Sequence, residues 1–250
     1  MMIRPSRAAF RRLRVRWSNA NGNNLAGLGS FHLQRVQVLA ARCFSTSSTD
    51  LPTSADAVVI GGGSIGASSA YHLQKAGLKT VLIEKHSLTA GTTWHSAGML
   101  WRLRPSDADI EMHSYTRLLA KQLAIETGIE SYTENGGLFI ANNEERLNEY
   151  KRLAEIGKYF NIEGIKMVSP EECKQIHPLL NVEDVVGGLY SKTDGTLDPT
   201  SWVMALAKAG RSLGLVISEG NGVRAIETTK TAGTSAISDR KQISGVTLSC

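Results

Sequence analysis

The 250-residue sequence predicts an α/β fold built on a strand, a helix and a second strand that follow one another closely. Residues 57–60 predict a short apolar strand, residues 65–76 a helix, and residues 80–83 a second buried strand. Gly77 stands just past the predicted helix, where glycine commonly ends one. Because crossover connections of this kind are right-handed, we expect the two strands to be parallel. The sequence therefore predicts a Rossmann-like βαβ unit.

A glycine-rich turn joins the first strand to the helix and fits the pattern G-x-G-x-x-G. Gly61 permits a tight turn, Gly63 lets the backbone approach a pyrophosphate, and Gly66 lets helix and strand pack closely. Ser64 opens the helix, whose N-terminal N–H groups attract phosphate. Glu84 follows the second strand, where its carboxylate can accept hydrogen bonds from ribose hydroxyls. The pattern does not separate FAD from NAD, but its place early in the predicted domain and the segment after Glu84 favour FAD.

The rest of the chain predicts a mixture of helices and strands. Ser169 and Pro170 mark a clear helix start, because serine caps a helix and proline suits its first position, and Glu172 can close a capping box. Asp198 and Pro199 repeat this signal. Further helices are predicted at 109–127, 144–160 and 199–213, strands at 137–141, 185–190, 215–218, 223–228 and 242–248, a turn at 194–195 and a polar loop at 230–240.

The positive charge of the chain is confined to its N-terminal segment. The formal net charge is +5, yet eight Arg and no Lys, Asp or Glu precede Asp50, so the remainder carries 20 basic and 23 acidic side chains. An Arg-rich, acid-free segment that contains Ser is typical of a mitochondrial transit peptide. We expect residues 1–44 to be removed after import and residues 45–250 to form the mature domain in the mitochondrial matrix. The alternative is a basic arm that binds nucleic acid or anionic lipid.

Composition disfavours several other classes of protein. The acidic excess after the leader gives no reason to expect a nucleic-acid partner. No apolar run approaches the ~20 residues needed to cross a bilayer, so we expect no membrane partner. Cys43, Cys173 and Cys250 have neither the spacing of a metal site nor that of a disulfide framework, so no metal is expected.

Residues 91–99 read Gly-Thr-Thr-Trp-His-Ser-Ala-Gly-Met, a segment too rich in small residues for a regular element. The segment resembles the flavin-attachment site of the sarcosine and dimethylglycine dehydrogenase family, a group of FAD-dependent amine oxidoreductases. The resemblance implies that His95 carries FAD covalently through the 8α-methyl carbon, and a neutral imidazole nitrogen is a suitable nucleophile. It also implies that Val223 contacts adenine through its backbone. Other residues implied to line the cofactor are Lys85, Gly91, Thr92, Thr93, Trp94, Ser96, Ala97, Gly98 and Met99.

The resemblance extends over residues 56–246. Residues 103–107, 135–141 and 149–153 look more like the sarcosine type, whereas residues 194–199 are shared with the dimethylglycine type. The family implies an FAD-binding domain of the D-amino-acid-oxidase type with interleaved substrate-domain elements. It implies a dehydrogenase that demethylates sarcosine to glycine and passes electrons from FAD to electron-transfer flavoprotein.

Three alternatives to this function stay open. Dimethylglycine is the alternative substrate. A non-catalytic regulatory relative, such as the regulatory subunit of pyruvate dehydrogenase phosphatase, and an inactive nucleotide-binding remnant are the alternative classes. The presence of His95 argues against the regulatory class, because a protein without flavin chemistry has little use for a flavin anchor.

The sequence departs from this family in its length. Family members continue with further FAD- and substrate-binding segments and with tetrahydrofolate-binding modules. We therefore expect a domain truncated at its C-terminus, tetrahydrofolate binding only in a longer protein, and amine-activating residues beyond Cys250, so the chain alone need not be active. The last strand, 242–248, is expected at an unfinished sheet edge. Arg102 and Arg104 could pair with a substrate carboxylate, but we interpret them as solvent-facing.

Overall fold

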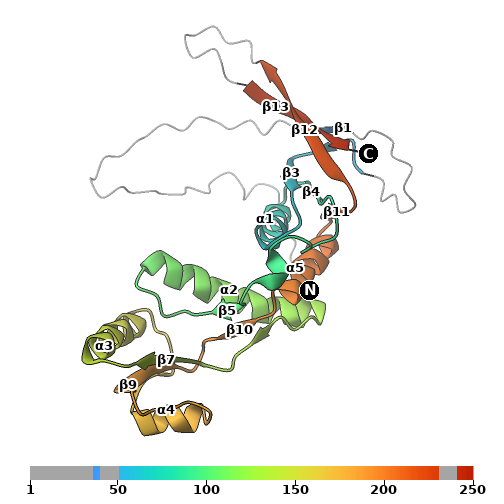
Figure 1. Ribbon diagram of the computed structural model, residues 1–250. Coiled ribbons are helices and arrows are strands. Elements are labelled where there is room, and N and C mark those ends of the chain that lie inside the picture. Colours follow the sequence, from blue (N-terminus) through green and yellow to red (C-terminus); the bar gives the residue numbers. More distant parts are fainter. Residues whose placement is uncertain (1–35, 40–50, 231–240, 250) are drawn as a thin grey trace, which may run out of the picture. The chain divides into compact units, whose positions relative to one another are not determined.

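A computed structural model describes residues 36–39, 51–230 and 241–249 (Figure 1). The predicted leader cleavage site and almost all of the predicted loop at 230–240 lie outside these residues. Within the described part of the chain, no helix is both long and apolar enough to span a membrane.

The predicted βαβ unit is present with nearly the expected boundaries. Strand β3 (Ala57–Ile60) leads into helix α1 (Ser64–Lys75), which is followed by strand β4 (Thr80–Ile83). The two strands are parallel, with Ala57 opposite Thr80. Strand β11 (Val216–Ser218) pairs in parallel on the other side of β4, so the strand order is β11-β4-β3. All four residues of β4 are buried, as expected for the central strand of a parallel sheet.

The main hydrophobic core holds this sheet to three helices. Helix α2 (Asp107–Thr127) ends at Gly128, which adopts a left-handed conformation with φ of 70°. Helix α5 (Pro199–Ser212) packs against both α1 and α2, and its first turn is capped by Asp198. Burying a leucine stabilises the fold by about 1.5–3 kcal/mol. The largest fully buried side chains of this core are Tyr71, Leu82, Leu123, Val203 and Leu206.

Two antiparallel sheets are interleaved along the chain with the nucleotide-type sheet. One has the order β5-β10-β6, and the other has the order β7-β9-β8 beside helices α3 and α4. The predicted strand at 185–190 begins later, at Gly187, and the predicted turn at 194–195 leads directly into β10. These elements are β5 (Met99–Leu100), β6 (Tyr132–Thr133), β7 (Gly137–Ala141), α3 (Glu144–Tyr159), β8 (Ile165–Val168), α4 (Pro170–Ile176), β9 (Gly187–Ser191) and β10 (Gly195–Leu197).

A fourth sheet contains the last strand. Strands β12 (Gly222–Lys230) and β13 (Lys241–Ser249) form an antiparallel pair, and β1 (Val36–Leu39) pairs in parallel with β13. Strand β2 (Ser54–Ala55) completes the order β12-β13-β1-β2. The prediction that the last strand lies at a sheet edge is therefore wrong, because β1 covers it. Strand β1 was not predicted, because it falls inside the predicted leader.

Candidate functional site

The glycine turn after β3 has the backbone geometry that the sequence pattern predicts. Gly61 has φ of +103°, which favours glycine, and its N–H donates to the carbonyl oxygen of Ile83 at 2.8 Å. A Cβ atom on Gly66 would lie only 1.9 Å from the carbonyl oxygen of Gly61, so the first helical turn can approach the loop only with glycine there. Gly63 is the N-cap of α1. Gly63 makes no side-chain cap bond, and helix N-termini of this kind bind phosphate groups.

Glu84 lies beside this turn at the end of β4. One carboxylate oxygen accepts from the N–H of Gly62 at 2.6 Å, and the other accepts from the N–H of His86 at 2.9 Å. Partial burial alone would raise the pKa of Glu84, but these two N–H donors outweigh it and hold its pKa below the ordinary value. Glu84 is thus ionised and fixed at the position predicted for contact with a ribose.

A cavity of about 440 Å³ opens next to Glu84. Its walls bring together four of the predicted cofactor residues, Gly61, Glu84, Lys85 and Val223. The other lining residues, which the sequence interpretation missed, are Ile60, Ile83, Gly220, Asn221, Gly222 and Ser249.

Part of the cavity wall that was not predicted from the sequence is a short loop between β11 and β12. Gly220 donates its N–H to the carbonyl oxygen of His86, and the N–H of Asn221 donates to that of Glu84 at 3.0 Å. The Asn-Gly pair between two predicted strands was the available signal, because such pairs mark tight turns. A cavity with a carboxylate, backbone amides and apolar walls fits an adenine and its ribose.

The segment after this unit contains the candidate flavin-attachment histidine. Residues Thr93–His95 form one turn of 3₁₀ helix. The Trp94 and His95 rings are stacked, with centroids 4.1 Å apart, and both side chains are exposed. The Nδ1 atom of His95 lies 3.1 Å from the carbonyl oxygen of Thr92. Because that oxygen can only accept, this contact favours, for a neutral ring, the tautomer with the proton on Nδ1 and a lone pair on Nε2.

One hydrogen bond ties this segment directly to the glycine turn. The N–H of Ser64 donates to Oγ1 of Thr93 at 3.0 Å. At the far end of the segment, Gly98 has φ of +67°, and a Cβ atom there would lie 2.2 Å from the carbonyl oxygen of Leu197. The segment is therefore held at both ends, to α1 by Thr93 and to β10 by Gly98.

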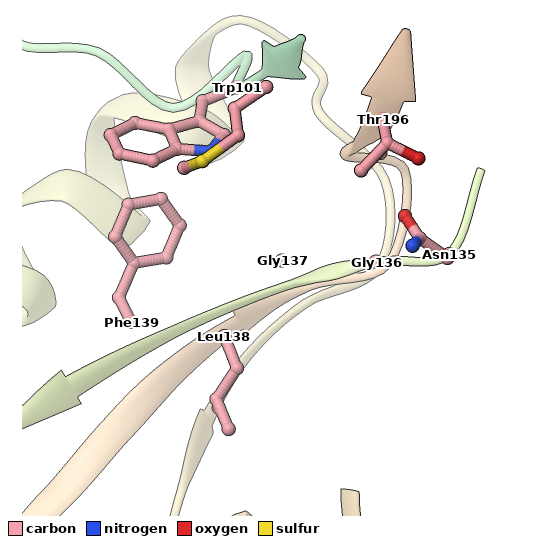
Figure 2. Close-up of a pocket in the computed structure, with 9 residues that line it drawn as sticks. Trp101, Asn135, Gly136, Gly137, Leu138, Phe139 and Thr196 are labelled. Carbon is pink, nitrogen blue, oxygen red and sulfur yellow. The ribbon is translucent and has the colours of Figure 1, made fainter. Parts of the chain in front are cut away.

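A second cavity, of about 300 Å³, begins where this segment ends (Figure 2). The Trp101 and Phe139 rings meet edge to face, with centroids 5.6 Å apart. Figure 2 shows these rings on one side of the hollow and the side chains of Asn135 and Thr196 on the other. Among the residues that the structure describes, no charged side chain lines it. The lining residues are Met99, Trp101, Asn135, Gly136, Gly137, Leu138, Phe139, Gly195 and Thr196.

The interpretation of Arg102 as solvent-facing is wrong. Arg102 is only 9% exposed, and its guanidinium donates to the hydroxyls of Ser114 and Thr193 at 3.2 and 2.9 Å. Its backbone N–H donates to Oδ1 of Asp194, which is fully buried. Burial raises the pKa of the Asp194 carboxyl and lowers the pKa of Arg102. Arg104 places its guanidinium 5.2 Å from the ring centroid of Trp101.

Several predicted residues line neither of these two cavities. The residues from Gly91 to Gly98 are absent from both walls, and only Met99 reaches the second cavity. Their roles toward a flavin therefore stay predictions. Among the described residues, no group of three or more His, Cys, Asp and Glu side chains could hold a metal ion.

The βαβ unit, the glycine turn and the cavity beside Glu84 define a dinucleotide-binding α/β protein. More specifically, the chain belongs to the family described as FAD dependent oxidoreductase, whose model matches residues 56–247.

Individual relatives agree with this family. The chain is 47% identical to the mitochondrial sarcosine dehydrogenase of Homo sapiens, over 69% of this chain and 19% of that protein. It is 38% identical to the mitochondrial dimethylglycine dehydrogenase of Homo sapiens, over 65% of this chain and 19% of that protein. Among solved structures, the L-proline dehydrogenase from P. horikoshii matches with a TM-score of 0.64 and 30% identity, covering 68% of this chain and 45% of that one. The chain thus spans about a fifth of the length of the curated relatives it matches.

Proposed function

We propose that this chain holds FAD for the oxidative N-demethylation of sarcosine to glycine. The observation that carries the proposal is that three features suited to different parts of FAD follow one another along the chain. The cavity beside Glu84 suits adenosine, the N-terminus of α1 suits a pyrophosphate, and the segment that follows carries His95. Its flanking residues match the flavin-attachment segment of sarcosine-type dehydrogenases.

In this proposal, the residues around the first cavity hold the adenosine end of FAD. Glu84 is ionised and can accept hydrogen bonds from both ribose hydroxyls, because each of its oxygens retains a free lone pair. Val223 and Gly222 border the same cavity and offer backbone groups to the adenine edge. Lys85 lies on the rim. These contacts bind and orient the cofactor.

His95 is the proposed covalent anchor, joined to the 8α carbon of the flavin. The contact of its Nδ1 with the Thr92 carbonyl selects the tautomer in which Nε2 is the nucleophilic atom. The exposure of His95 leaves this atom accessible to a bound flavin. When bound, FAD supplies the acceptor for a hydride equivalent from the amine.

The second cavity is the proposed site for the methylated amine. Aromatic faces attract cations, and a methylated ammonium suits an apolar, aromatic wall better than a hydrated lysine-like ammonium does. Trp101 and Phe139 provide two such rings, and Met99 connects the cavity to the segment that carries His95.

The remaining parts of the proposal are supported by family resemblance. Electrons would pass from FAD to electron-transfer flavoprotein, and tetrahydrofolate would bind only in a longer protein. The protein would act in the mitochondrial matrix after loss of residues 1–44, a segment that includes β1.

Anaerobic reduction of bound FAD tests the substrate. Sarcosine, dimethylglycine and glycine would be added separately to the FAD-loaded chain, and loss of the oxidised flavin absorption would be followed. We expect fastest bleaching with sarcosine and none with glycine. Faster bleaching with dimethylglycine would support dimethylglycine as the substrate. Bound FAD that no amine reduces, both in this chain and in a longer protein that continues past Cys250, would contradict the proposed enzyme and favour the non-catalytic regulatory alternative.

A further inference from the structure

Asp194 lies beside the second cavity, although its side chain is not one of those that line it. The residue is fully buried. A Cβ atom on Gly137 would lie 3.1 Å from Cβ of Asp194 and 3.2 Å from its Oδ2 atom. Alternate residues of a strand point to the same face, so a side chain at Gly137 would share the face of Phe139, whose ring borders the cavity (Figure 2). The Asp194 side chain therefore packs against the cavity face of β7, where Gly137 has no side chain.

This one residue is connected to each of the three stretches that make the cavity wall. Oδ1 of Asp194 accepts from the N–H of Arg102 at 3.0 Å, directly after Trp101. The backbone carbonyl oxygen of Asp194 accepts from the N–H of Gly136 at 2.9 Å. The chain then continues into Gly195, which begins the third stretch. The three stretches, which are distant in sequence, therefore meet at Asp194.

The preceding residue, Thr193, reinforces the same junction. Its hydroxyl accepts from the guanidinium of Arg102 at 2.9 Å, and its carbonyl oxygen accepts from the hydroxyl of Tyr132 at 2.8 Å. Thr193 and Arg102 are both buried. Hydrogen bonds of charged groups are stronger than those between neutral groups, and burial keeps water from competing for them. These bonds should therefore hold the walls at a fixed separation.

We infer that Asp194 is a positioning residue that fixes the width of the second cavity and thereby selects amines by size. It acts through Arg102 and Gly136 and does not touch the ligand. Sarcosine carries one N-methyl group and dimethylglycine carries two. A wall of fixed width distinguishes them, because the second methyl group must displace well-packed atoms. The selectivity rests on the proposed amine site, whereas the positioning of the walls does not.

Hydrogen exchange of backbone amides, followed by mass spectrometry, tests the positioning of the walls without any ligand. Asp194→Ala removes the acceptor for the N–H of Arg102. We expect faster exchange in residues 99–102 and 135–139 and little change in the glycine turn, 61–66. Asp194→Asn retains an acceptor oxygen and should restore the slow exchange of the parent. Acceleration confined to the two wall stretches distinguishes local positioning from a general loss of stability.

A matched control is available four residues along the chain. Asp198 also has a carboxylate that accepts one backbone N–H, that of Ser201, but it lies outside the cavity wall. Asp198→Ala should therefore leave exchange in both wall stretches as it is in the parent.

Thr193→Val decides the question if Asp194→Ala does not fold. It removes only the hydroxyl that accepts from Arg102, so it should speed exchange in residues 99–102 and not in 135–139. Three results would overturn the inference. They are parent-like exchange in the walls of the variant that folds, equal acceleration in the glycine turn, and failure of Asp194→Asn to restore slow exchange.

Affinities for sarcosine and dimethylglycine test the selectivity. They would be measured by titration calorimetry on the FAD-loaded chain, with the flavin chemically reduced beforehand so that no amine is oxidised. We expect the parent to favour sarcosine by about tenfold, the scale for one methyl group in a pocket, and Asp194→Ala to bring this ratio close to one. An unchanged ratio would overturn the role of Asp194 in selectivity. A parent that binds neither amine would contradict the proposed amine site and the selectivity with it, and hydrogen exchange still decides whether Asp194 positions the walls.

Discussion

Two strand pairs at the candidate sites, β3 with β4 and β5 with β10, differ in how far apart their paired residues lie along the chain. Strands β3 and β4 pair after one intervening helix, with Ala57 opposite Thr80. In contrast, β5 pairs with β10, so Leu100 lies opposite Gly195. Because β3 and β4 pair across one short helix, this unit could be predicted from the pattern of neighbouring residues. Long-range pairing in the second region builds a cavity whose walls come from three separate stretches of sequence.

The region around β3 and β4 and the region of the antiparallel sheets also hold their polar groups in different ways. The nucleotide-type region fixes polar groups with short local contacts, such as Glu84 with the N–H of Gly62. The antiparallel region instead buries a polar group, Asp194, between distant segments and places aromatic rings around an uncharged hollow. A cofactor needs the first kind of site, and a methylated amine suits the second.

Core truncations give the largest expected effects and test whether the two regions share one folding unit. Leu206 belongs to the core under the nucleotide-type sheet, and Leu189 belongs to the core beside β7-β9-β8, both fully buried. Leu→Ala at either position should cost about 2–5 kcal/mol of unfolding free energy, measured by urea denaturation. In Leu189→Ala, ADP should still raise the melting temperature. Loss of this ADP effect would show that the two regions do not divide their tasks as described.

Two helical glycines provide the next test. Gly66→Ala would press a Cβ atom against the backbone oxygen of Gly61, at 1.9 Å, and backbone cannot move aside cheaply. We expect a loss of about 1–3 kcal/mol of stability and of ADP binding. The matched variant Gly157→Ala in α3 would meet the ends of two side chains, Ile165 and Leu103, which can rotate. It should cost less and leave ADP affinity unchanged; equal effects of the two variants would contradict this account.

The buried carboxyl of Asp194 gives a smaller, pH-dependent effect. Because burial raises its pKa, the folded state keeps this proton at pH values where the unfolded chain has released it. The free energy of unfolding therefore falls as the pH rises through that interval. Asp194→Asn cannot titrate, so its stability relative to the parent should increase from about pH 4 toward pH 7. Thermal unfolding across this range measures the change.

Helix capping gives the smallest expected effect. Ser169 accepts from the N–H of Glu172, and the Glu172 side chain accepts from the N–H of Ser169, which completes a capping box. Ser169→Ala should cost about 1 kcal/mol. Ser106 is the N-cap of α2 but makes no side-chain cap bond, so Ser106→Ala should cost less in the same denaturation experiment. A larger loss in Ser106→Ala would contradict the assignment of the cap.

The sequence predicted the elements that local chemistry determines. The βαβ unit, the glycine turn and the capping box at Ser169 are confirmed, because each depends on residues within a few positions of one another. The strands β5, β6, β8 and β10 were not predicted, because they are fixed by partners elsewhere in the chain.

The candidate site likewise contains residues that were predicted from the sequence and features that were not. Gly61, Glu84 and Val223 were predicted and meet in one cavity. The burial of Arg102 was not predicted, because its partners Ser114 and Thr193 follow no sequence spacing. The pairing of β1 with β13 was not predicted either, because the composition of the predicted leader does not indicate a strand or its partner.

Flavin fluorescence on a denaturing gel tests the central claim most directly. The chain, His95→Ala and His177→Ala would each be incubated with FAD, denatured and compared; His177 is exposed and lies at the end of α4, outside the walls of both cavities. We predict a fluorescent band for the parent and for His177→Ala and a dark band for His95→Ala. A fluorescent His95→Ala band, or a dark parent that nevertheless binds ADP, would contradict covalent attachment of FAD at His95.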